Sequence, residues 1–272
     1  MFWLGKHPEV AAFTTEVTML QRKHSWDLVE MIYRDLPDGP YKRGYKSPSD
    51  IYNKAVLRVM RDCFPETKLL IGIRHPVKWF ESFYNYRVQN GFVMPPAQFM
   101  EKNCVSGQHG VCLERSRFYF TLAKLGKTAL NGSELNVFEP YHRNMLLSES
   151  PKYIPNPIFI YDTSQLNDEN ETRSQAFRRD LAKYLGLSQE LPPPLHYSPG
   201  HSLNETEQAR RDSLKIDICQ PKYWKLRAAL TRNGKKVELW IQTFLLQSKD
   251  VLISNPEHFL AILEDYKRDP CN

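Results

Sequence analysis

The sequence predicts an α/β fold of three layers with a mainly parallel sheet, and three observations carry this prediction. The runs at 69–73 and 156–166 are short and apolar and lack polar alternation, as buried parallel strands do. Segments with helical spacing alternate with the strand-like segments. A chain of 272 residues with 41% hydrophobic content can also bury one sizeable core. We therefore expect a single domain over residues 1–272.

The first part of the chain predicts short elements in alternation. Residues 1–7 have the pattern of a helix end, which Pro8 stops, and residues 11–17 predict a strand. Residues 26–37 predict a helix before a Pro-Asp-Gly-Pro turn. The residues expected on its apolar face are Trp26, Val29, Ile32, Tyr33 and Leu36.

The next segment predicts a strand, a turn and a helix. Residues 43–50 read as a short strand that ends in a turn. Ser49 or Asp50 can then cap a helix that runs to about Arg61.

Residues 68–91 hold the most informative pattern in the chain. The apolar run ends abruptly in Arg74, His75 and Pro76, and an aromatic helical segment with Ser82 follows. Pro76 suits the first turn of a helix, because the N–H that it lacks would have no partner there. An arginine at the carboxyl end of a strand, facing the N–H groups of a helix, describes a site for an anion such as phosphate. Arginines at such junctions are, however, also commonly solvated or paired with a carboxylate.

The second half of the chain is mostly helical in its pattern. Residues 92–156 are irregular, with one helix near 113–125. Residues 156–166 predict the second buried strand, and 172–187 predict a helix with Gly186 at its C-terminal cap. The C-terminal region, 200–272, predicts three further helices, at 223–230, 237–247 and 256–266.

Charge and hydropathy narrow the range of partners. The net charge of +6 comes from basic residues that are scattered along the chain. This favours an anionic partner, but it fits an ordinary basic surface equally well. Nucleic-acid binding is not expected, because no basic stripe with interleaved aromatic residues occurs. No stretch approaches the roughly 20 consecutive apolar residues of a membrane span, and the amino terminus lacks a signal-peptide pattern.

Cysteines and sequons point to an oxidising compartment. Cys104 and Cys112 flank a short polar loop that a disulfide could close in such a compartment. His109 between them makes a poor zinc signature, so we expect no metal site. Three N-x-S/T sequons fit a secretory location, at Asn131, Asn170 and Asn204. Together these features indicate a lumenal protein.

The string Ile-Arg-His-Pro at 73–76 resembles a motif of sulfotransferases that use 3′-phosphoadenosine 5′-phosphosulfate. The likeness includes Ser82, eight positions after the arginine, and Tyr84, two positions after the serine. The resemblance implies that Arg74 and Ser82 bind the 3′-phosphate of this co-substrate. It also implies a P-loop-NTPase-like fold, with residues 92–156 shaping the acceptor site. The family more often has aspartate where this chain has His75.

Two earlier segments resemble the glycan sulfotransferases, particularly those of the heparan sulfate type. Residues 14–20 resemble their Lys-Glu-Val-His-Phe-Phe segment, which implies that Glu16 is the general base. Residues 44–51 resemble their Gly-Glu-Lys-Ser-Pro segment, which implies that Lys46 lies near the acceptor and the sulfuryl group. The residues themselves leave simpler interpretations open, namely a solvated surface glutamate and a lysine at a strand-end turn.

One part of the family pattern is missing. A Lys-x-Gly-Thr-Thr-type loop, which holds the 5′-phosphosulfate, does not occur, and neither does G-x-x-x-x-G-K-[ST]. Residues 1–10 resemble the helix that follows this loop. We therefore expect that the chain starts one strand and one loop late and is weakly active or inactive by itself. The resemblance also implies a type II membrane protein of the Golgi lumen, whose anchor is not in this chain.

The expected function is transfer of a sulfuryl group from 3′-phosphoadenosine 5′-phosphosulfate to a hydroxyl or amine of a glycan. Two other classes stay open. One is a non-catalytic relative that binds a glycan or a partner, or a truncated and inactive fragment. The other is a small-molecule kinase of related architecture, which would need a phosphate loop ending in Gly-Lys-Ser/Thr.

Overall fold

The structure is a computed structural model that describes residues 3–22, 24–101, 110–130, 132–148, 153–194 and 205–272. Contacts within the chain group it into two compact units. Unit 1 comprises Met1–Ile73, Thr121–His196 and Phe244–Phe259, and unit 2 comprises Arg74–Phe120, Tyr197–Thr243 and Leu260–Asn272. We describe each unit by itself, and the expectation of a single domain stays a prediction.

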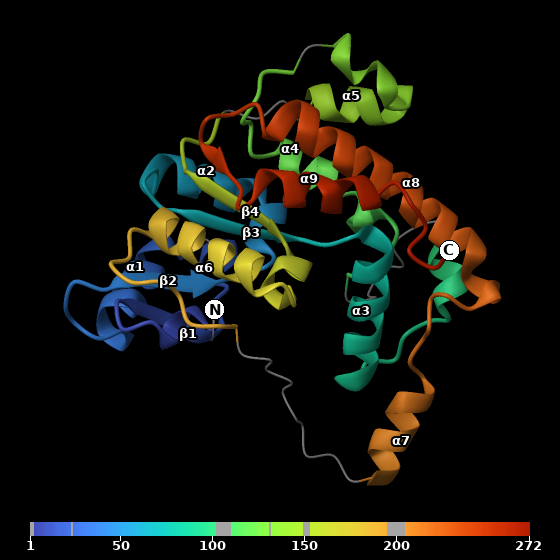
Figure 1. Cartoon of the computed structure of the whole chain (residues 1–272), viewed down its shortest axis with the longest axis horizontal. Helices are drawn as coiled ribbons and strands as arrows, with labels where there is room; N and C mark the ends of the chain where they lie inside the picture. Colours follow the sequence, from blue (N-terminus) through green and yellow to red (C-terminus); the bar gives the residue numbers. More distant parts are fainter. Residues whose placement is uncertain (1–2, 23, 102–109, 131, 149–152, 195–204) are drawn as a thin grey trace. The chain divides into compact units, whose positions relative to one another are not determined.

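Unit 1 contains all five strands of the described residues, and every pairing between them is parallel. Strand β1 (Val10–Glu16) pairs with β2 (Lys42–Lys46) in a first sheet. Strands β3 (Leu69–Ile73), β4 (Ile158–Asp162) and β5 (Val251–Leu252) form a second sheet, with β4 in the middle (Figure 1). The predicted α/β class with parallel strands is confirmed, although the strands form two sheets.

Helices cover both faces of the strands in unit 1. Helices α1 (Ser25–Asp35) and α2 (Lys54–Cys63) share one apolar cluster with Leu69 of β3. Helix α6 (Glu171–Leu185) shares another cluster with Leu70 of the same strand. Because successive side chains of a strand point to opposite faces, these helices lie on opposite sides of β3. Unit 1 therefore has the expected three layers.

The strand before Arg74 is less buried than predicted. Only Ile73 of β3 is buried, whereas Leu69 to Ile71 are half-buried and Gly72 is exposed. The reason is position, since β4 is the one neighbour with which β3 pairs in the described chain. Strand β4 lies between two strands, and its residues Ile158 to Ile160 are fully buried as predicted.

Two predictions for the helices of unit 1 are wrong in detail. In α1 the buried residue is Leu28, whereas Trp26 and Tyr33 are 82% and 64% exposed. Helix α2 begins at Lys54 after Asn53, whose Oδ1 accepts hydrogen bonds from the N–H groups of the next turn at 2.9 and 3.4 Å. Asp50 does not cap it, because this buried carboxylate accepts bonds from nearby side chains instead.

Unit 2 is built on two long helices, α3 (Pro76–Gln89) and α8 (Trp224–Trp240). Buried residues of both helices, including Phe80 and Leu230, belong to one apolar cluster. The sequence predicts two helices where α8 is continuous into a π-helical turn at Ile241–Leu245. Gly234 is buried within the helix, where a Cβ would collide with the carbonyl oxygen of Tyr266, so this position requires glycine.

The remaining helices are shorter. Their bounds are α4 Phe118–Ala123, α5 Pro140–Ser148, α7 Glu205–Ser213 and α9 Pro256–Asp265. The sequence reasoning missed α5, α7 and β5, and the predicted N-terminal helix is a single 3-10 turn at Leu4–Lys6. No helix of the described residues is long and apolar enough to cross a membrane.

The described residues contain a disulfide in addition to the expected one. Cys219 and Cys271 form a disulfide that the sequence did not suggest, and Cys63 is free. Cys112 is disulfide-bonded, but Cys104 lies outside the described residues, so the pair proposed from the sequence stays a prediction.

Candidate functional site

Arg74 and His75 stand between the end of β3 at Ile73 and the start of α3 at Pro76. His75 caps the helix, because its Nδ1 accepts a hydrogen bond from the N–H of Val77 at 3.1 Å. Pro76 follows at the first helical position, as predicted. The histidine thus provides the acceptor that an aspartate carboxylate would provide at an N-cap. This explains physically how His75 can stand where the resembling family more often has aspartate.

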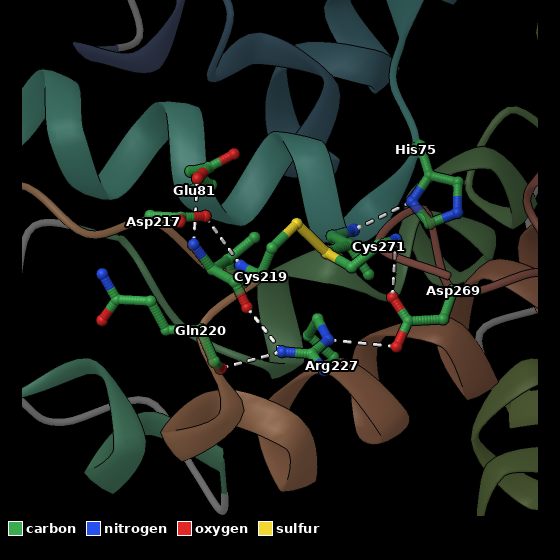
Figure 2. The surroundings of a disulfide bond; sticks show 10 residues. His75, Glu81, Asp217, Cys219, Gln220, Arg227, Asp269 and Cys271 are labelled. Atoms are coloured by element: carbon green, nitrogen blue, oxygen red, sulfur yellow. Dashed lines mark hydrogen bonds and ion pairs between the residues drawn. A yellow bond between two sulfur atoms is a disulfide. The ribbon is translucent and has the colours of Figure 1, made fainter.

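The other ring nitrogen of His75 forms a hydrogen bond with the C-terminal segment of unit 2. Since Nδ1 accepts from an N–H, Nε2 carries the proton and donates to the carbonyl oxygen of Arg268 at 3.1 Å. Tyr266 meets the imidazole edge-on, with 5.2 Å between the ring centroids. Figure 2 shows this ring beside the segment that carries Asp269 and Cys271. The turn before α3 is therefore fixed from both sides of one imidazole.

A disulfide and an ion pair attach that C-terminal segment to other parts of unit 2 (Figure 2). Cys271 is bonded to Cys219, which lies 52 positions earlier in the chain. Arg227 of α8 pairs with Asp269 at 3.0 Å and donates to the carbonyl oxygen of Gln220 at 3.0 Å. These contacts link the C-terminal segment, the loop around Cys219 and α8 within unit 2.

Arg74 and Ser82 are both available to a ligand. Arg74 is half-buried, and within the described part of the chain its guanidinium has no hydrogen-bond acceptor or carboxylate partner. Ser82 is exposed on α3, and its hydroxyl likewise has no partner among the described residues. Among the described residues, no carboxylate pairs with Arg74, so this part of the chain does not show the carboxylate-paired alternative.

Glu16 and Lys46, the two predicted catalytic residues, lie together in unit 1. They stand at the carboxyl ends of β1 and β2 and are directly opposite in the parallel register. Glu16 Oε1 lies 3.2 Å from Lys46 Nζ, and the side chains are 56% and 49% exposed. An ion pair this exposed adds at most about 1 kcal/mol to stability, so the fold does not depend on it.

A polar network that the sequence reasoning missed holds the turn after Lys46. Asp50 accepts hydrogen bonds from Ser47 at 2.6 Å, from Gln21 at 2.8 Å and from the hydroxyl of Tyr45 at 3.1 Å. Burial, and then the nearby Asp50 carboxylate, raise the pKa of Tyr45 above its ordinary value. In the sequence, only the Lys-Ser-Pro triplet indicated this turn, and no pattern indicated that Gln21 takes part in the network.

The structure places the four predicted residues in two pairs, one in each unit. Arg74 and Ser82 belong to unit 2, and Glu16 and Lys46 belong to unit 1. In the described residues, no group of three or more histidine, cysteine, aspartate or glutamate side chains could hold a metal ion.

The chain was compared with family models, curated sequences and solved structures. No family model and no curated protein sequence matches the chain. Among solved structures, a sulfotransferase from Alicyclobacillus acidocaldarius is similar, with a TM-score of 0.43 and 14% sequence identity. The alignment covers 84% of this chain and 88% of that one. A likeness at this level leaves the activity and the acceptor open.

Proposed function

We propose that the chain is a sulfotransferase that moves a sulfuryl group from 3′-phosphoadenosine 5′-phosphosulfate to a hydroxyl or amine of a glycan. The observation that carries this proposal is the junction at Arg74. There an arginine without a partner in the described chain directly follows a parallel strand and directly precedes a capped helix. The sequence of this junction also resembles the 3′-phosphate motif of that family.

The chemistry of the junction suits a phosphate dianion. The guanidinium of Arg74 can donate two parallel N–H bonds to phosphate oxygens. The hydroxyl of Ser82 can donate a further bond, and the N-terminus of α3 carries a partial positive charge that favours an anion. Arg74 and Ser82 would hold the nucleotide's 3′-phosphate, and the 5′-phosphosulfate has no matching loop in the sequence.

The pair Glu16–Lys46 suits the transfer step. The acceptor oxygen or nitrogen forms a bond to sulfur while the bond from sulfur to the 5′-phosphate oxygen breaks. The Glu16 carboxylate would take the acceptor's proton, and the Lys46 ammonium would stabilise negative charge on the sulfuryl oxygens. Both side chains are exposed enough to meet a ligand.

The disulfide supports the proposed location. A bond between Cys219 and Cys271 is typical of proteins in oxidising compartments and rare in the cytosol. We propose the Golgi lumen or another part of the secretory pathway on this ground, together with the sequons. Of these, Asn170 is an exposed residue at the N-cap of α6.

A transfer assay tests the function. Purified protein is incubated with radiolabelled 3′-phosphoadenosine 5′-phosphosulfate and a mixture of desulfated glycans, and label on the glycan is measured. The proposal expects weak transfer, because no loop for the 5′-phosphosulfate occurs in the sequence, and Arg74→Ala and Glu16→Gln should both reduce it. Binding of the nucleotide without transfer would favour the non-catalytic alternative, and phosphate transfer from ATP would favour the kinase.

A further inference from the structure

A second arginine, Arg87 of α3, lies close to two aromatic rings. Its guanidinium carbon is 5.0 Å from the ring centroid of Phe83 and 4.8 Å from that of Phe92. Its Nε is buried without a hydrogen-bond acceptor. Within the described chain, Arg87 has no ion-pair partner either. The cation therefore contacts two aromatic rings, while its N–H donors have no acceptor among the described residues.

The end of α3 accounts for the contact between Arg87 and Phe92. Gly91 has a φ of +80°, which glycine adopts without strain, and its N–H bonds to the carbonyl oxygen of Val88 at 3.0 Å. The N–H of Phe92 bonds to the carbonyl oxygen of Arg87 at 3.1 Å. These are the two bonds of a Schellman motif, which brings the residue after the glycine back over the last turn. The backbone itself thus places the Phe92 ring on Arg87.

A second cation lies against the same ring system. The guanidinium carbon of Arg115 is 5.2 Å from the Phe83 centroid, on a ring that Arg87 also contacts. Arg115 also donates a hydrogen bond to the carbonyl oxygen of Gly110 at 3.5 Å. A bound anion would supply acceptors for the in-plane donors of Arg87.

The neighbouring surface suits a saccharide better than a small ion. Tyr86 is 51% exposed and stacks on Phe83, with 6.3 Å between centroids and 19° between the planes. A partly exposed aromatic face offers apolar contact to the C–H face of a sugar ring. The polar edge of Arg87 beside it can bind an oxyanion on that sugar in bidentate fashion.

We propose that these five residues, Phe83, Tyr86, Arg87, Phe92 and Arg115, bind an acidic saccharide through a carboxylate or sulfate group. We refer to them as the Arg87 cluster. Naming this saccharide as the acceptor rests on the proposed function, whereas oxyanion binding rests on the geometry alone. Arg87 itself lies apart from the predicted phosphate contact at Ser82, since five helical positions place it about 140° around α3, whereas Tyr86, four positions after Ser82, lies about 40° from it.

Calorimetric titration with saccharides of equal length tests the proposal. The probes are a sulfated heparin hexasaccharide, a carboxylated hyaluronan hexasaccharide and uncharged chitohexaose. We expect binding of at least one acidic probe and none of the uncharged one. Arg87→Gln should weaken that binding about tenfold, the effect of losing one charge-assisted contact. Arg87→Lys, which keeps the charge but loses the planar fork, should recover only part of it.

Two controls distinguish the loss of a specific contact from a general loss of positive charge and from unfolding of the variant. Arg232→Gln removes one exposed cation from α8 of the same unit and should change saccharide affinity less than twofold. Thermal unfolding reports whether each variant is folded, and if Arg87→Gln is not, the comparison of wild type with Arg87→Lys decides. Equal losses in Arg87→Gln and Arg232→Gln would overturn the proposal, because they would mean a diffuse charge effect.

Two more outcomes are decisive. Equal affinity for an acidic glutamate peptide would overturn the assignment to a saccharide. Binding of 3′-phosphoadenosine 5′-phosphate is measured in the same variants and should not change in Arg87→Gln. If no variant binds this nucleotide while the saccharide effect holds, the proposed function fails and the inference stands. If nucleotide binding is normal and Arg87→Gln leaves saccharide affinity unchanged, the inference alone fails.

Discussion

Glu16 and Lys46 are 30 positions apart in sequence, yet their charged atoms lie 3.2 Å apart at the ends of neighbouring parallel strands. The two strands pair in parallel with a constant register up to Ala12. The register then shifts, and Glu16 lies opposite Lys46 after this shift. The two residues, which were identified from separate sequence segments, are thus neighbours in the fold. Both are exposed, so the pair is better suited to chemistry than to holding the fold.

Glu16→Gln should reduce sulfate transfer by roughly 10²–10⁴-fold, the usual contribution of a general base. Because the side chain is exposed, the free energy of unfolding should change by less than about 1 kcal/mol. Rates of transfer and urea unfolding curves measure the two effects. Glu30→Gln is the matched control, since Glu30 is an exposed carboxylate on α1 with an arginine 3.9 Å away. Equal rates in both variants would exclude Glu16 as the base.

His75→Ala should lower the free energy of unfolding by roughly 1–2 kcal/mol, because the N-cap of α3 loses its acceptor. His75→Asn keeps an acceptor for the N–H of Val77 and should recover part of that loss. Chemical denaturation measures both values. The cap account is wrong if alanine and asparagine destabilise the protein equally.

Opening the disulfide should destabilise unit 2. The double variant Cys219→Ser with Cys271→Ser removes a crosslink between residues 52 positions apart, for which the typical loss is about 2–4 kcal/mol. Hydrogen exchange should show faster exchange in the C-terminal segment and in the first turn of α3, which His75 links to it. Cys63→Ser removes the free cysteine and should change neither quantity. Unchanged exchange around His75 in the double variant would break the proposed link.

Acid should loosen α7. Hydrogen bonds from Arg210 and Arg211 lower the pKa of Glu207 to about 2. A carboxylate whose folded pKa is depressed contributes stability above its unfolded pKa, near 4.3, and loses it as the pH falls through the folded value. After correction for the intrinsic exchange rate at each pH, the protection of the α7 amides should therefore fall between about pH 4.5 and pH 2. In Glu207→Gln this pH dependence should be smaller, and an identical profile would contradict the assignment.

Local patterns predicted most of the elements around the site. The strand at Leu69–Ile73, the proline at the start of α3 and the C-cap at Gly186 all follow from short-range rules and are confirmed. Apolar character did not predict burial, since β3 is as aliphatic as β4 but pairs on one side only. The sequence predicted two helices at 223–230 and 237–247 where α8 is one continuous helix, and the contact of Gly234 with Tyr266, which is distant in sequence, could not be predicted.

Side-chain relationships across long separations could not be predicted in the same way. The ion pair of Glu16 with Lys46 depends on strand register, and the bond from His75 to Arg268 joins residues 193 positions apart. The Arg87 cluster could be predicted only in part. Gly91 marks its helix end in the sequence, but the stacking of Phe92 on Arg87 follows only once the Schellman bonds are seen.

The affinity of the protein for 3′-phosphoadenosine 5′-phosphate, measured by calorimetry in wild type and Arg74→Ala, tests the central claim most directly. We expect wild type to bind and Arg74→Ala to lose roughly 1.5–3 kcal/mol, the scale of a charge-assisted contact. Arg232→Ala, which removes an exposed cation from the same unit, should bind as wild type does. Equal affinity of wild type and Arg74→Ala would contradict the claim that this arginine holds the 3′-phosphate.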